Sequence, residues 1–258
     1  MHRFFVPDAR HQEVVTLPEA EALHATRVLR LAPGDSVTLL DGAGGEHAGE
    51  LTEVRRHHVT VRIQSRKTHP ARATQLTLIQ SVAKGPAMEG LVHRAVELGC
   101  HRLIPLVTDR SVSRPDSTGD KQARWQAIAV EAAKQSGNPW RMTVEPPQSV
   151  AQWQRQREPL DLLAIASLVD APVSPRNRWL AFQAIHHRGP RTVGIIIGPE
   201  GDLTPEEYAV FREEGAQSFS LGTHVLRVET AAVAALAVWQ SLLEAESPGT
   251  HPKSDSFS

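Results

Sequence analysis

Cysteine is almost absent from this chain: Cys100 is the only one among its 258 residues. A single cysteine cannot form a disulfide within the chain, which excludes a disulfide framework and fits the cytosol. The longest largely apolar run without a charge, 230–243, is too short to span a membrane and is typical of a buried helix. No signal peptide is visible, because Pro7, Asp8 and Arg10 closely follow the first six residues. We therefore expect a cytoplasmic protein without a membrane partner.

An excess of positive charge is also missing, since 28 Lys and Arg against 29 Asp and Glu give a net charge of −1. A general nucleic-acid binder would be strongly basic, although a local basic face or an assembled particle as partner remains open. Metal-binding motifs are missing too. The adjacent pairs His57-His58 and His186-His187 point apart on any regular element, and neither HExxH nor CxxC occurs. We therefore expect no metal site.

The most informative stretch is 194–207, which reads GIIIGPEGDLTPEE. Its three isoleucines predict a strand buried on both faces of a parallel sheet. The glycines that follow, Gly198 and Gly201, allow a positive φ and a close approach of the backbone to a ligand. Thr204 is the expected N-cap of a helix, and Glu207 completes a capping box. A strand, a glycine turn and a helix together predict a ligand site at the carboxyl end of this strand.

A second stretch of the same kind follows closely. Residues 219–221 predict a short strand, and 225–230 (VLRVET) lead into an apolar helix at 231–243. We therefore expect Arg227 and Glu229 in a loop beside the start of that helix. Either stretch alone is typical of an ordinary βα unit. The two together are a far more specific signal of function.

The rest of the chain divides into two regions. Residues 1–70 read as an all-β module with one helix at Leu17–Leu31, and alternating strands and helices after a linker at 68–74 predict an α/β domain at 75–246. The polar end, 247–258, is expected to be a disordered tail. Predicted strands are 36–40, 50–54, 58–63, 76–82, 102–107, 162–168 and 193–197; predicted helices are 86–98, 120–136, 149–157 and 178–187.

The motifs GPEG-x-L-T-x-x-E and LG-x-x-VLR-x-ETA together resemble the SPOUT class of RNA methyltransferases. The closest resemblance is to the RsmE family, the ribosomal RNA small subunit uridine-N3 methyltransferases. Two residues depart from the family pattern. Asp202 stands where a third glycine is usual, which could alter the pocket loop, and Asn138 replaces a common arginine. Other similar segments are VLRL at 28–31, KG at 84–85, ELG at 97–99, RSV at 110–112 and AAKQSG at 132–137.

The resemblance implies an α/β SPOUT-type trefoil-knot methyltransferase domain with an N-terminal all-β PUA-like barrel. It also implies S-adenosyl-L-methionine as cofactor, 16S rRNA in the 30S subunit as partner, and a homodimer. The implied cofactor-binding residues are Ser167, Leu168, Gly198, Pro199, Glu200, Gly201, Leu221, Gly222, Val225, Leu226 and Arg227. Candidates for RNA binding are Arg3, Arg27, Arg30, Arg94, Arg110 and Gln135.

Arg227 and Glu229 are the catalytic candidates under this resemblance. The arginine would stabilise negative charge on the uracil oxygens, and the carboxylate or a water would take the N3 proton. A structural ion pair that holds the loop is the alternative for these two residues. Two other functions also stay open, a non-catalytic RNA-binding ribosome assembly factor and a SPOUT methyltransferase with another RNA target.

Overall fold

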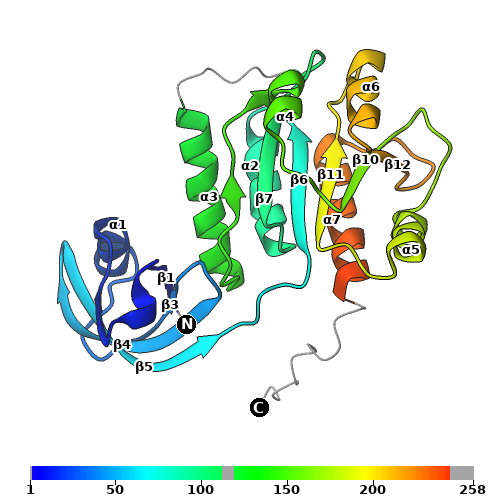
Figure 1. The fold of residues 1–258 in the computed structure, drawn as a ribbon. Helices are drawn as coiled ribbons and strands as arrows, with labels where there is room; N and C mark the ends of the chain where they lie inside the picture. The colour runs from blue at the N-terminus through cyan, green and yellow to red at the C-terminus, as the bar shows by residue number, and fades with distance from the viewer. Residues whose placement is uncertain (1, 112–118, 245–258) are drawn as a thin grey trace. The chain divides into compact units, whose positions relative to one another are not determined.

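The computed structural model describes residues 2–111 and 119–244, which form two compact units (Figure 1). The N-terminal unit consists of Met1–Arg72, Gly85–Leu103 and Pro115–Pro147, and the C-terminal unit consists of Ala73–Lys84, Ile104–Arg114 and Gln148–Ser258. The domain boundaries expected from the sequence stay predictions. The tail expected at 247–258 lies outside the described residues.

A five-stranded sheet in the order β1-β3-β4-β5-β2 forms the core of the N-terminal unit. Strands β1 and β3 pair in parallel and the other pairs are antiparallel. Alternating side chains such as Val37, Leu39, Val59 and Val61 are buried on one face, as the period-2 pattern predicts. The strands are β1 His2–Phe5, β2 Val14–Thr16, β3 Ser36–Leu40, β4 Gly45–Arg55 and β5 His58–Thr68.

The helix expected at Leu17–Leu31 is wrong in its extent. An α-helix, α1, covers only Glu19–Leu23 and continues as one π-helical turn, η2, at His24–Val28. Within it, the Thr26 hydroxyl donates a hydrogen bond to the carbonyl of Ala22 at 2.9 Å and so competes with the regular helical bond. Apolar spacing alone does not reveal this change of helical register.

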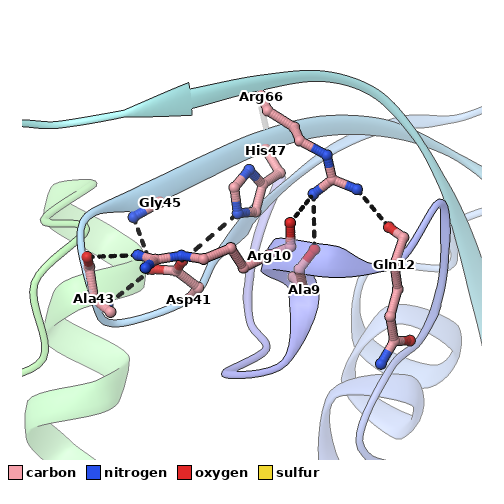
Figure 2. Close-up of polar contacts among 8 residues, drawn as sticks. All are labelled: Ala9, Arg10, Gln12, Asp41, Ala43, Gly45, His47 and Arg66. Carbon is pink, nitrogen blue, oxygen red and sulfur yellow. Dashed lines mark hydrogen bonds and ion pairs between the residues drawn. The ribbon is translucent and has the colours of Figure 1, made fainter.

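A polar cluster around the buried side chains of Asp41 and His47 joins the β3–β4 turn to its surroundings (Figure 2). The Asp41 carboxylate accepts hydrogen bonds from the backbone amides of Ala43 (2.8 Å) and Gly45 (2.7 Å) and from Nε of Arg10 (3.0 Å). Burial alone would raise the pKa of Asp41, but these donors lower it below its usual value. His47 Nε2 lies 3.7 Å from the same carboxylate, and burial lowers the pKa of this histidine.

Arg66 belongs to the same cluster and holds the 3-10 helix η1, Ala9–His11 (Figure 2). Its NH1 group donates to the carbonyls of Ala9 and Arg10, both at 2.9 Å, and its NH2 group donates to the carbonyl of Gln12 at 2.6 Å. Arg10 and Arg66 therefore stabilise the fold of this unit through these bonds. They are more than solvated charges on its surface.

Two helices, α2 (Pro86–Glu97) and α3 (Asp120–Ser136), complete the N-terminal unit and pack against each other. A buried ion pair joins α3 to α1: Lys134 Nζ lies 2.9 Å from the Glu21 carboxylate. The short strand β8, Thr143–Val144, pairs in parallel with the first two residues of β7, Arg102–Val107.

The C-terminal unit contains parallel strands in the order β12-β10-β11-β6, followed by the last four residues of β7, with β9 beside the end of β7 (Figure 1). This arrangement confirms the expected α/β class. Helix α7 packs against β6 and β11, and α4 and α6 share a buried core with the sheet. The strands are β6 Gln75–Ser81, β7 Arg102–Val107, β9 Gln148–Ser149, β10 Leu162–Ala166, β11 Thr192–Ile197 and β12 Gln217–Phe219; the helices are α4 Val150–Gln156, α5 Pro175–His186, α6 Pro205–Glu213 and α7 Val228–Glu244.

Two boundaries near the candidate site differ from expectation. Strand β12 ends at Phe219, two residues early, because the Ser220 amide donates to the Val173 carbonyl instead of continuing the strand. Helix α7 begins at Val228, so the expectation that Glu229 lies in a loop is wrong. An acidic residue in the first turn of a helix is favourable beside the free backbone N–H groups. In the described part of the chain, no helix is both long and apolar enough to cross a membrane.

Candidate active site

A pocket lies at the carboxyl ends of three neighbouring strands of the C-terminal unit. Strand β10 ends at Ala166, β11 at Ile197 and β12 at Phe219, and all three residues line it. The strands are parallel, so the loops that follow them meet at one edge of the sheet. The first turn of α7 supplies the remaining wall through Val228 and Ala231.

Most of the implied cofactor residues meet in this pocket. Two do not line it, namely Gly201 and Arg227. The implied residues that do are Ser167, Leu168, Gly198, Pro199, Glu200, Leu221, Gly222, Val225 and Leu226. The sequence did not point to the lining residues Ala166, Ile197, Phe219, Ser220, Val228 and Ala231, although the predicted strand ends could have indicated several of them.

The walls combine apolar side chains with backbone. Leu168 and Val225 stand at the pocket with 62% and 78% of their surfaces exposed. Exposed apolar side chains gathered around a concave site are typical of ligand binding. The described residues contain no group of three or more His, Cys, Asp or Glu side chains that could hold a metal ion.

The turn after β11 has a different conformation from the one expected. Neither Gly198 nor Gly201 has a positive φ; the residue that does is Asp202, at 61°. Space is tight at Gly198, because a Cβ there would lie 3.2 Å from Cγ of Leu203. A Cβ at Gly201 would meet Arg110 at an ordinary 3.5 Å. The requirement for glycine is therefore stronger at the first position.

Side chains from both sides brace this turn. The Glu207 carboxylate accepts from the Thr204 amide at 3.0 Å and completes the expected capping box, which is confirmed. Its other oxygen accepts from the Asp109 amide at 2.9 Å. Arg110 NH1 donates to the Gly201 carbonyl at 2.9 Å. The loop after β7 thus holds the turn in place, a role that the sequence did not reveal for Asp109 or Glu207.

The two catalytic candidates lie at the start of α7. Arg227 directly follows the lining residue Leu226, its side chain is exposed, and its carbonyl accepts the Ala231 amide at 2.8 Å. Glu229 is half-buried in the first helical turn. Within residues 2–111 and 119–244, no ion pair joins Arg227 to Glu229, so the bracing ion pair considered above does not form in this structure.

The candidates for RNA binding have different surroundings. Arg3 caps the end of α3 by donating to the carbonyls of Lys134 and Gln135 at 3.2 and 3.1 Å. Arg110 braces the turn described above. The other candidates are exposed on the N-terminal unit: Arg27, Arg30, Arg94 and Gln135.

Asn138, which departs from the family pattern, has a structural role in the N-terminal unit. Its side-chain amide donates to the Val96 carbonyl at 3.0 Å, and its Oδ1 accepts from the Trp140 amide at 3.0 Å. It therefore connects the end of α2 to the segment that follows α3.

Comparison with known proteins places this chain in a family. Residues 70–240 match the RNA methyltransferase domain, and residues 17–64 match the RNA methyltransferase PUA domain. The ribosomal RNA small subunit methyltransferase E of Synechocystis sp. is 31% identical over 241 residues, which cover 92% of this chain and 76% of that protein. The chain belongs to the RsmE family. Its Bacillus subtilis relative of the same name is 28% identical over 246 residues, covering 92% of this chain and 95% of the relative.

Solved structures agree with membership of the RsmE family. The ribosomal RNA small subunit methyltransferase E from Neisseria gonorrhoeae, bound to S-adenosyl methionine, has a TM-score of 0.82 at 30% identity, covering 94% of this chain and 98% of that one. A methyltransferase structure from Legionella pneumophila with bound cofactor SAM also reaches 0.82, at 28% identity, covering 93% and 97%. The expected SPOUT class with a PUA-like N-terminal domain is confirmed, whereas the trefoil knot stays a prediction.

Proposed function

We propose that this chain methylates N3 of one specific uridine in 16S rRNA of the small ribosomal subunit. As an RsmE family member it is an S-adenosylmethionine-dependent methyltransferase of small-subunit ribosomal RNA. The observation that carries the proposal is the pocket at the ends of β10, β11 and β12, in a fold whose RsmE neighbour binds S-adenosyl methionine. The choice of uridine N3 rests on the motifs shared with the family.

The pocket suits the cofactor. Leu168, Val225 and Leu226 offer apolar surface for the flat adenine, and the backbone at Gly198 can approach the ribose closely. When bound, S-adenosylmethionine supplies a methyl group activated by its sulfonium. We propose that the implied cofactor residues that line this pocket hold it there. Gly201 and Arg227 would act from just outside the pocket.

Arg227 and Glu229 are proposed to prepare the uridine. N3 of uracil carries a proton at neutral pH and is a poor nucleophile until that proton leaves. The Arg227 guanidinium, exposed beside the pocket, would stabilise the negative charge that then spreads to O2 and O4. Glu229, directly or through a water, would accept the proton. The free lone pair of N3 then attacks the methyl carbon, and the electrons of the breaking bond stay on sulfur.

The N-terminal unit is proposed to position the RNA. With a net charge of −1, the whole chain has limited attraction for bare RNA, whose binding is dominated by phosphate contacts. An assembled 30S subunit would add recognition of shape, while the target base is turned out into the pocket. Arg27, Arg30 and Arg94 are exposed and available for phosphate contacts.

A transfer experiment with three substrates tests this function. Labelled S-adenosylmethionine is incubated with the protein and either 30S subunits, protein-free 16S rRNA or 50S subunits. We expect label in the 30S subunits, much less in free 16S rRNA and none in 50S subunits. Equal rates on free rRNA and on 30S subunits would reject an assembled-particle substrate. Cofactor binding without transfer to any of the three would favour the non-catalytic assembly factor.

A further inference from the structure

Asp202 occupies a backbone conformation that few residues other than glycine adopt. Its φ of 61° is in the left-handed region, where aspartate and asparagine are tolerated better than most side chains. The side chain also stabilises the turn directly, because Oδ1 accepts the backbone amide of Leu203 at 2.8 Å. The residue lines the pocket at the end of β11. A glycine could adopt the same φ but has no side chain to accept this hydrogen bond.

Tyr208 connects Asp202 to a second wall of the pocket. This tyrosine lies in α6, is 3% exposed, and donates its hydroxyl hydrogen to Oδ1 of Asp202 at 2.9 Å. Ser167, at the end of β10, is among the groups that affect the pKa of this tyrosine. Burial, together with Asp202, raises the pKa of Tyr208 to about 12, so the phenol stays protonated and remains a donor near neutral pH.

The loop after β10 is held by the same helix face. Ser167 Oγ accepts from the backbone amides of Val169 (3.3 Å) and Asp170 (3.2 Å), which shapes this loop. Asp170 pairs with Arg212 at 2.8 Å, and the guanidinium of Arg212 lies 5.2 Å from the ring centroid of Tyr208. Tyr208 and Arg212 are four residues apart and therefore lie on one face of α6.

We propose that Asp202 is a positioning residue, which acts through Tyr208 to hold the turn after β11 and the loop after β10 at the separation the cofactor needs. This inference rests on the proposed function of the pocket. Loss of the link leaves both loops formed but free to move apart, so the cofactor must order them on binding. The expected cost is a weaker cofactor affinity, while methyl transfer at saturating cofactor changes little. Asp202 thus compensates for the absent glycine by adding a connection that glycine lacks.

Four variants separate the effect of the backbone conformation at Asp202 from the effects of its hydrogen-bond acceptor and of the Tyr208 donor. Asp202→Asn keeps an acceptor and tolerates the left-handed φ, so its affinity for S-adenosylmethionine should stay within about threefold of the parent. Asp202→Gly keeps the φ but loses the acceptor, and Tyr208→Phe loses the donor; each should weaken the cofactor affinity roughly tenfold. The double variant Asp202→Gly with Tyr208→Phe should be no weaker than the worse single variant, because both remove the same link.

Calorimetry with S-adenosylmethionine and single-turnover methylation at saturating cofactor are measured for each variant. Thr52→Val is the matched control, because it removes a side-chain hydrogen bond (to Thr60, 2.8 Å) in the N-terminal unit and should leave the affinity unchanged. Asp202→Gly and Tyr208→Phe proteins that are folded and bind the cofactor as tightly as the parent would overturn the inference. Additive losses in the double variant would overturn it as well. A parent protein without cofactor affinity would instead contradict the proposed function.

Discussion

Gly198 and Gly201 lie three residues apart in one turn, yet their surroundings differ. A Cβ at Gly198 would be in tight contact with Leu203 at the end of β11, whereas one at Gly201 would make an ordinary contact with the side chain of Arg110. We therefore expect Gly198→Val to lower the affinity for S-adenosylmethionine by roughly 100-fold, which corresponds to about 2.8 kcal/mol, and Gly201→Val to lower it less. Calorimetry measures both. Equal losses would show that the whole turn, rather than the space at Gly198, is required.

At the residue scale, substitutions of Arg227 test whether this side chain acts in methyl transfer or in cofactor binding. Its proposed contact forms with charge that develops only as N3 loses its proton, so Arg227→Ala should lower the single-turnover rate by roughly 10²–10³. The cofactor affinity should change much less, because the side chain does not line the pocket. Arg227→Lys should restore little activity, because an ammonium lacks the planar fork of donors.

The result that would contradict this role is a normal single-turnover rate combined with weakened cofactor binding. Arg227 would then belong to the pocket wall. Glu229→Gln serves as the companion variant: if the carboxylate helps to remove the proton, raising the pH should partly restore its rate, because more of the uridine is then ionised.

At the scale of elements, local signals were predictable. The isoleucine run of β11 and the capping box of Thr204 and Glu207 depend on neighbours within a few residues, and the structure confirms both. The positive φ was assigned to the wrong residues, because the bonds that hold Asp202 in this conformation include one to Tyr208, six residues ahead and inside the next helix. Predicting the pocket required the order of the strands in the sheet, which only the family resemblance implied.

The stability of the β3–β4 hairpin should depend on pH because of His47. Burial depresses the pKa of His47 in the folded protein, so the unfolded chain binds the additional proton below about pH 6.5. Stability is therefore lost as the pH falls through this range, by at most about 1.4 kcal/mol per pH unit from one group. Asp41, Arg10 and Arg66 are the charged groups that affect this histidine. Asp41, with a lowered pKa of its own, adds a further loss at more acidic pH.

His47→Leu should remove this contribution while keeping an apolar side chain of similar size. Amide hydrogen exchange of β3 and β4 between pH 5 and 8, corrected for intrinsic rates, gives the local free energy of opening. Between pH 7 and pH 5, the local free energy of opening should fall more in the parent than in the variant. The same pH slope in both proteins would contradict the assignment.

At the scale of the whole molecule, we propose a homodimer formed through the C-terminal unit. Leu180 and Ile185 on α5 and Val238 on α7 are exposed by 44%, 71% and 40%, although all three are large apolar side chains. A closed two-fold pair is the commonest way to cover such a surface. Light scattering at micromolar concentration should give twice the chain mass, and Ile185→Glu should shift it toward the monomer. A fully active monomeric parent would contradict the pairing.

The identity of the methylated nucleoside tests the central claim most directly. Small subunits that lack the modification are incubated with the protein and S-adenosylmethionine carrying a labelled methyl group. The RNA is then digested to nucleosides and separated against authentic standards. We expect one labelled nucleoside, N3-methyluridine, at about one per subunit, and none with Arg227→Ala on the same timescale. Label in a different nucleoside, such as a ribose-methylated or C5-methylated uridine, would contradict the proposed chemistry at N3.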